Sequence, residues 1–227
     1  DRPPPPTARM LKFMRANPRV IGVDFDNTIA CYDDLLCQLA LERGLVRADA
    51  ARGKKAIRDH IRTLPDGENE WQRLQAIMYG PAIEGARPFE GVLDFLRSCR
   101  ARGMVVQIVS HKTSHSNLLR GGADFREAAT RWMAGRGFFD ASGIGLTPAQ
   151  VHYESTREEK VARLQSLRCG YFIDDLEETF GEKTFPVDVK KVLFNPHGEP
   201  VRVAGVHACS SWRQIKELVV DGGARRS

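Results

Sequence analysis

The sequence of 227 residues contains no long apolar run and no closely spaced pair of cysteines. A helix that crosses a bilayer needs about 20 mostly apolar residues in succession, and no segment approaches that length. The first residues, Asp1 and Arg2 followed by four prolines, also lack the apolar stretch of a signal peptide. We therefore expect a cytoplasmic protein without a membrane partner.

The five cysteines are scattered along the chain, at positions 31, 37, 99, 169 and 209. An odd number without closely spaced pairs is typical neither of a disulfide framework nor of a zinc site. Reduced thiols, most of them packed in the interior, are expected.

The net charge of +5 and the pI near 9.1 suit an anionic ligand. The basic residues are spread among nearly as many acidic ones, and no basic cluster carries interleaved aromatic residues. A small phosphorylated metabolite fits this charge as well as nucleic acid does, and the missing aromatic clusters oppose nucleic acid. The sequence does not indicate an oligomeric state.

With 42% hydrophobic residues the chain can bury a sizeable core, and its length suits one domain with an insertion or two small domains. Residues 1–18 are expected to form an extended, partly disordered tail because of the proline run. Since the first residue is not Met, we expect this end to be a trimmed tail, a tag remnant or a cut from a longer polypeptide.

Short β-branched runs that end in polar residues indicate buried strands. They span residues 19–23, 104–109, 171–173 and 191–194, with residues 151–153 as a further candidate. The polar residues that follow the first three are Asp24, Ser110 and the pair Asp174 and Asp175.

Amphipathic helices are expected between these strands. The clearest apolar face consists of Phe125, Ala128, Ala129, Trp132 and Met133, with Asp124 and Glu127 placed as a capping box. Two more helices are expected over residues 89–96 and 212–220. The alternation predicts an α/β fold, a Rossmann-like parallel sheet flanked by helices, which binds ligands at the carboxyl ends of its strands.

The segment from residue 31 to residue 86 lacks β-rich runs. Its helical pieces cover residues 34–43, 54–64 and 70–79. We predict a helical insertion after the first strand, with residues 19–30 and 87–227 forming the α/β core.

Asp24 and Asp26 lie two positions apart directly after the first predicted strand. One carboxylate could attack an electrophile while the other, displaced along the loop, transfers protons. Acidic residues are also common in loops, so the pair alone is compatible with an ordinary loop that has no catalytic role. Ser110 is similar, because a hydroxyl at a strand end could hold a phosphoryl oxygen or could simply form a turn.

Lys160 lies near the start of a helix that Thr156 and Glu159 could open as a capping box. Its ammonium and the free amides of that helix would then face the same way, unless the lysine is merely solvated. The adjacent Asp174 and Asp175 repel each other unless a cation compensates, and Mg²⁺ is the natural partner of such oxygens. The alternative for this pair is an acidic helix start.

Taken in order, these pieces resemble the motifs of the haloacid dehalogenase superfamily, over residues 19–195: strand-Asp24-x-Asp26-x-Thr28, strand-Ser110, helical Lys160, strand-Asp174-Asp175. The resemblance implies a phosphatase-type hydrolase in which Asp24 is the nucleophile that forms an aspartyl-phosphate. Asp26 would act as acid and base, and Lys160 would offset charge. The residues assigned to substrate binding are Thr28, Ser110, His111 and Lys112.

The resemblance also implies Mg²⁺ as cofactor. Its ligands would be the carboxylate of Asp24, the main-chain carbonyl of Asp26 and one acid of the later pair. We favour Asp175 as the direct ligand, with Asp174 orienting Lys160 or a metal-bound water.

Residues 31–86 would be a small cap domain that selects the substrate. The expected activity is hydrolysis of a small phosphomonoester, such as a sugar or polyol phosphate. Asp26 favours ester cleavage over dehalogenation, because a departing alkoxide needs a proton. The alternatives are a domain of a larger biosynthetic enzyme with a binding or scaffolding role, and a phosphatase of nucleic-acid ends.

Overall fold

The computed structural model describes residues 16–47, 53–115 and 123–222, so residues 1–15 of the expected tail lie outside the described residues. The chain divides into two compact units. Among the described residues, the core unit comprises residues 16–28, 90–111 and 147–222, and the helical unit comprises residues 29–47, 53–89, 112–115 and 123–146. Each is described by itself.

The core unit contains a six-stranded sheet in the order β5-β4-β1-β6-β7-β8, with every neighbouring pair parallel. The strands are β1 (Asn17–Val23), β4 (Val105–His111), β5 (Val151–Glu154), β6 (Cys169–Asp174), β7 (Lys190–Phe194) and β8 (Val206–Cys209). The predicted α/β class is confirmed. Strand β8 was not predicted, because its short sequence mixes polar and apolar residues.

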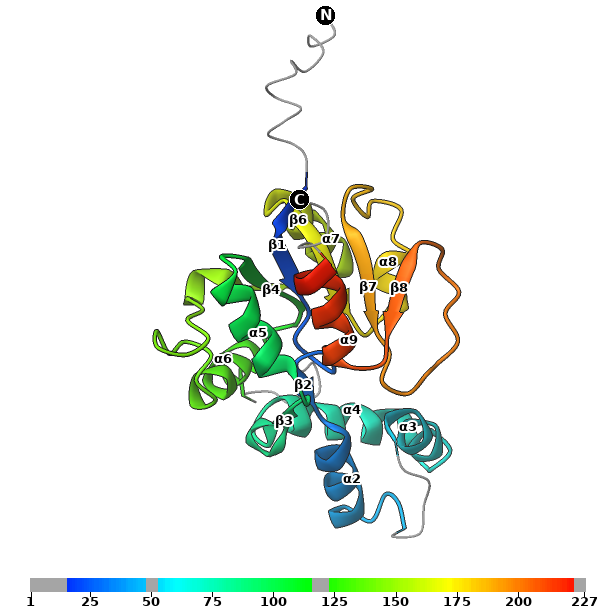
Figure 1. Cartoon of the computed structure of the whole chain (residues 1–227). Coiled ribbons are helices and arrows are strands. Elements are labelled where there is room, and N and C mark those ends of the chain that lie inside the picture. The colour runs from blue at the N-terminus through cyan, green and yellow to red at the C-terminus, as the bar shows by residue number, and fades with distance from the viewer. Residues whose placement is uncertain (1–15, 48–52, 116–122, 223–227) are drawn as a thin grey trace, which may run out of the picture. The chain divides into compact units, whose positions relative to one another are not determined.

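Helices lie on both faces of this sheet, with α5 and α9 on one face and α7 on the other (Figure 1). Their bounds are α5 (Val92–Ala101), η2 (Pro148–Gln150), α7 (Arg157–Ser166), α8 (Glu177–Phe180), α9 (Trp212–Lys216) and its continuation η3 (Glu217–Asp221). Burial on both faces explains why the central strands are continuous apolar runs. Phe172 and Leu193 pack towards Leu164 of α7, whereas Phe194 packs on Trp212 of α9.

The helix expected over residues 89–96 begins later, at Val92, and ends at Ala101. Gly91 precedes it with a φ of 85°, a conformation that favours glycine and interrupts a regular helix. A Cβ at Gly91 would lie 3.2 Å from the Cβ of Trp212, so this glycine also permits close packing of α5 on α9.

The helical unit contains α2 (Asp33–Glu42), α3 (Lys54–Arg62), α4 (Gly67–Tyr79), η1 (Ile83–Gly85) and α6 (Phe125–Gly135). The three helices expected in the insertion are confirmed within three residues at each end. β2 (Ala30–Cys31) and β3 (Arg87–Pro88) pair as an antiparallel ribbon at the two ends of the insertion. The predicted apolar face of α6 is buried, and the side chain of Asp124 caps this helix by accepting from the amides of Arg126 and Glu127.

Residues 112–115 and 123–146 pack in the helical unit, although the sequence placed them in the core. The indole of Trp132 donates to the carbonyl of Ala86 at 2.9 Å. Arg136 donates to the carbonyls of Glu84 and Ala86 at 2.7 and 2.8 Å. These bonds join α6 to the end of the insertion. The cap role of residues 31–86 stays a prediction.

All five cysteines are free, and Cys99, Cys169 and Cys209 are buried. Burial raises the pKa of Cys99 and of Cys169 to about 12, which is typical of packed, unreactive thiols. Within the described ranges no helix is both long and apolar enough to cross a membrane.

Candidate active site

The acids and the serine proposed for chemistry lie at the carboxyl ends of three adjacent strands of the core unit. Strand β1 pairs with β4 on one side and β6 on the other, so the carboxyl ends of all three meet at one edge. The amide of Asp24 donates to the carbonyl of Ile173 at 2.9 Å, which extends the pairing of β1 with β6 by one residue. Asp24 and Asp174 therefore lie side by side at this edge.

Lys160 joins these two acids. Its Nζ lies 2.7 Å from Oδ1 of Asp24 and 2.7 Å from Oδ2 of Asp174. All three side chains are buried, with Lys160 only 2% exposed. The pair of bonds makes Lys160 part of the acidic site and not a solvated surface lysine.

Helix α7 presents this lysine from its first turn. The hydroxyl of Thr156 accepts from the amide of Glu159 at 3.1 Å, and the carboxylate of Glu159 accepts from the amide of Thr156 at 3.0 Å. The predicted capping box is therefore confirmed. It fixes the beginning of α7, and with it the position of Lys160.

Burial and neighbouring charges shift the pKa values of Lys160 and Asp24. For Lys160 burial alone lowers the pKa, but the carboxylates of Asp174 and Asp24 outweigh it, so the pKa is raised and the ammonium stays charged. Burial raises the pKa of Asp24 to about 7 against the opposing effect of Lys160, and the carboxylates of Asp174 and Asp26 add to the rise. Asp24 and Asp174 thus share one buried lysine while Asp26 adds a further negative charge nearby, and a further cation would relieve the repulsion among these acids.

The donor set fits a hard divalent cation. One carboxylate oxygen from each of Asp24, Asp174 and Asp175 lies within 4.8 Å of the other two. Oxygen donors of this kind are the ligands that Mg²⁺ prefers. Both oxygens of Asp174 accept hydrogen bonds, from Lys160 and from the amide of Leu176, which agrees with an orienting role for this acid.

The loop that follows Asp24 turns sharply at Asn27, whose φ of 59° lies in the left-handed region. Asparagine tolerates this region better than most residues. The turn brings the hydroxyl of Thr28 to the other acidic loop, where it accepts from the amide of Asp175 at 3.0 Å and donates to its Oδ1 at 3.4 Å. Thr28 was assigned to substrate binding, and the structure gives it this contact between loops.

Ser110 is fully buried near the end of β4. Within the part of the chain that the structure describes, its Oγ is the buried side-chain polar atom without a hydrogen-bond partner. Buried polar groups nearly always have partners, so this hydroxyl is available to a water or a ligand.

The other two residues assigned to substrate binding have different surroundings. The Nε2 of His111 lies 3.0 Å from the carbonyl of Ser155. Lys112 belongs to the helical unit, where its Nζ lies 4.8 Å from the centre of the Tyr79 ring. Their substrate-binding roles stay predictions.

Sequence reasoning missed Trp212. Its indole N–H donates to the carbonyl of Thr28 at 3.1 Å. A tryptophan on the apolar face of a helix carries no sequence signal that distinguishes it from an ordinary core residue.

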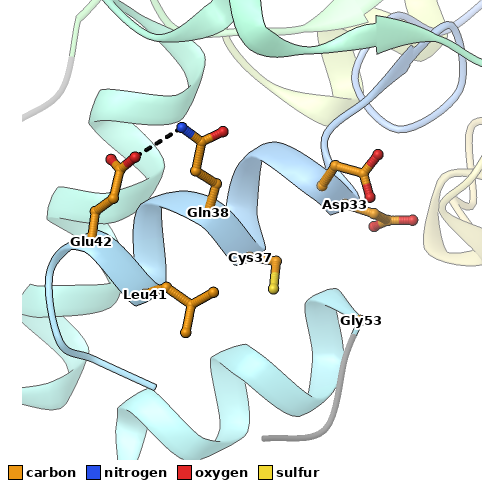
Figure 2. Close-up of a pocket in the computed structure, with 7 residues that line it drawn as sticks. Asp33, Cys37, Gln38, Leu41, Glu42 and Gly53 are labelled. Atoms are coloured by element: carbon orange, nitrogen blue, oxygen red, sulfur yellow. Dashed lines mark hydrogen bonds between the residues drawn. The ribbon is translucent and has the colours of Figure 1, made fainter. Parts of the chain in front are cut away.

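A hollow of about 470 Å³ lies in the helical unit, and none of the residues predicted for the site lines it. Figure 2 shows Cys37 and Leu41 of α2 around it, together with Gly53, the residue that precedes α3. The other lining residues are polar or acidic: Asp33, Asp34, Gln38 and Glu42. With no basic or orphaned buried group among these described residues, the hollow identifies no ligand.

The sheet order and the site together define an α/β core of the haloacid dehalogenase fold, as the motif resemblance predicted. No family model matches the sequence, and no curated protein matches it significantly.

Solved structures show the fold. A haloacid dehalogenase family hydrolase from Deinococcus radiodurans R1, described with bound phosphate and sodium, matches with a TM-score of 0.56 at 15% identity over 90% of this chain and 96% of its own. A superfamily hydrolase of subfamily IA, variant 1, from Geobacter sulfurreducens PCA matches with a TM-score of 0.53 at 14% identity, over 88% of this chain and 95% of its own. A dehalogenase described with an intermediate complex matches with a TM-score of 0.54 at 14% identity, over 88% of this chain and 96% of its own.

Proposed function

We propose that this chain is a Mg²⁺-dependent hydrolase of a small phosphomonoester, such as a sugar or polyol phosphate, with Asp24 as nucleophile. The observation that carries the proposal is the buried lysine that bridges Asp24 and Asp174 beside a third acid. A solved structure of the same fold is described with bound phosphate, which supports a phosphate ligand.

In this mechanism a carboxylate oxygen of Asp24 attacks phosphorus as the bond from phosphorus to the leaving oxygen breaks. Asp26 gives its proton to the leaving alkoxide, and the alcohol departs. Asp26 then takes a proton from water, which attacks phosphorus and releases inorganic phosphate and free Asp24.

Lys160 holds Oδ1 of Asp24 in place, and its charge opposes the repulsion between this carboxylate and the phosphate. A divalent cation held by Asp24, Asp175 and the main-chain carbonyl of Asp26 would supply further charge neutralisation and orient the phosphoryl group. The buried hydroxyl of Ser110 donates to a phosphoryl oxygen.

Replacing Ser110 by Ala is expected to lower kcat/KM by about 10- to 100-fold, because a hydrogen bond to a charged group contributes about 1.5–3 kcal/mol. Thermal stability should stay the same or rise slightly, because the hydroxyl that is lost has no partner among the described residues. Steady-state kinetics and melting curves of the variant check both expectations. A lower melting temperature with unchanged kcat/KM would assign Ser110 to the fold alone.

Removal of divalent ions is expected to abolish turnover. Mg²⁺ should restore it, and Ca²⁺ should inhibit because its looser, higher coordination disturbs the in-line geometry. Calorimetric titration of the metal-free chain should show Mg²⁺ binding that Asp175→Asn weakens at least about tenfold. Undiminished hydrolysis in excess chelator would mean that the acidic cluster is structural.

The function itself is tested by a screen of purified protein against phosphorylated metabolites with Mg²⁺. Haloacids and a duplex oligonucleotide with terminal phosphates are run in parallel. Preferred turnover of a small phosphomonoester supports the proposal. Preference for the haloacid or the duplex would identify a dehalogenase or an end phosphatase, and absence of turnover throughout would favour a scaffolding domain.

A further inference from the structure

Trp212 is the first residue of α9 and is almost completely buried, with 1% exposure. Its ring centre lies 5.0 Å from that of Phe95 on α5 and 5.7 Å from that of Phe194 on β7. Ser211 caps the helix by accepting from the amide of Gln214. The indole is therefore held by three elements of the core unit and has a fixed orientation.

The polar edge of this indole meets the loop that carries Asp24. Its Nε1 donates to the main-chain oxygen of Thr28 at 3.1 Å, in a fully buried environment. Thr28 is also the last residue of this stretch of the core unit, after which the chain enters the helical unit. The hydrogen bond thus ties the end of the catalytic loop to the packed core.

The same threonine contacts the second acidic loop. Its hydroxyl lies 3.0 Å from the amide and 3.4 Å from Oδ1 of Asp175. A continuous set of hydrogen bonds therefore runs from Trp212 through Thr28 to Asp175. Small displacements matter here, because sites of this kind need their ligands held within about 0.5 Å.

We propose that Trp212 is a positioning residue for the acidic site: its indole N–H sets the main chain of Thr28, so that the threonine hydroxyl holds Asp175 in place to bind the divalent cation. This inference rests on the proposed function, because it assumes that Asp175 is a metal ligand. Trp212 touches no reacting group and acts only through Thr28.

The test compares Mg²⁺ affinities by calorimetry of the metal-free chain. Trp212→Phe keeps the ring packing and removes the donor, and it should weaken Mg²⁺ binding by about three- to tenfold. Trp132→Phe is the matched control, because Trp132 is also buried and also donates to a main-chain carbonyl, that of Ala86. Both variants should lose similar thermal stability, but the control should keep its Mg²⁺ affinity.

A double-mutant cycle tests the path through Thr28. Thr28→Val should weaken Mg²⁺ binding, and Trp212→Phe should add little in that background, whereas Thr28→Ser should retain the affinity of the unaltered chain. Effects of Trp212→Phe and Thr28→Val that multiply independently would overturn the path. Unchanged Mg²⁺ affinity in Trp212→Phe with lowered stability would overturn the inference and leave the proposed function standing.

A measurement on the unaltered chain tests the inference without requiring that any variant folds. In NMR spectra, Mg²⁺ should shift the indole N–H resonance of Trp212 and leave that of Trp132 in place. Equal shifts, or none at Trp212 while Mg²⁺ binds, would overturn the inference. No Mg²⁺ binding by the unaltered chain would overturn the proposed metal site and this inference together.

Discussion

Asp24→Asn is expected to reduce turnover by a factor on the order of 10⁴ or more, because the amide has the shape of the carboxylate but cannot attack phosphorus. The folded state should persist. The amide oxygen can still accept from Lys160, whose Nζ lies 2.7 Å from Oδ1 in the unaltered chain. Initial rates on the best phosphomonoester and melting curves test both parts.

The matched control is Asp94→Asn. Asp94 is also paired with a lysine, Lys216, at 2.7 Å, but its side chain is 65% exposed. Turnover should be unaffected in this control. Acid-quenched samples of the unaltered chain should contain a phosphoryl adduct on Asp24 by mass spectrometry, and the Asp24→Asn variant should contain none. Full activity in that variant would remove Asp24 from the chemistry.

Lys160→Met should have the next largest effect, on activity and stability together. Turnover should fall by about 10²- to 10³-fold, because a charge that opposes the repulsion between Asp24 and phosphate is lost. The free energy of unfolding should fall by about 3–5 kcal/mol at pH 8, because two buried carboxylates lose their partner. Lys216→Met, which breaks an exposed pair, should cost only about 0–1 kcal/mol.

The pH dependence gives a second check on Lys160→Met. Burial raises the pKa of Asp24, and without the opposing charge of Lys160 this pKa should rise further, so that the folded state binds more protons than the unfolded state. Stability is therefore expected to increase as the pH falls from 8 to about 5. Denaturant titrations at several pH values measure this slope. Stability losses equal to those of Lys216→Met at every pH would show that the buried pairs contribute little.

Several features of the site could be predicted because they depend on local patterns. An apolar run followed by Asp24 or by Asp174 indicates a strand end wherever it occurs, and parallel strands bring such ends to one edge. Thr156 and Glu159 define a helix start by their spacing alone, which placed Lys160 in its first turn. Helices α2, α3 and α4 could also be predicted from the sequence, because their apolar residues repeat with the period of the helix.

Other features depend on residues far apart in the chain. Whether Asp174 or Asp175 faces Lys160 depends on the pairing of β6 with β1, and a strand turns successive side chains to opposite faces. The start of α5 at Val92 depends on the backbone of Gly91 and on its packing against Trp212. Local periodicity contains neither fact.

The sequence by itself determined the α/β class, most strands and helices near the candidate site, and the residue types at that site, because burial and helix capping produce periodic and short-range patterns in the sequence. Only the tertiary structure decided that β1 lies between β4 and β6, that residues 123–146 pack with the insertion, and that Trp212 bonds to Thr28. These depend on hydrogen bonds and packing between distant segments. The sequence indicates that a buried donor or an apolar face needs a partner, but it does not indicate which segment of the chain provides that partner.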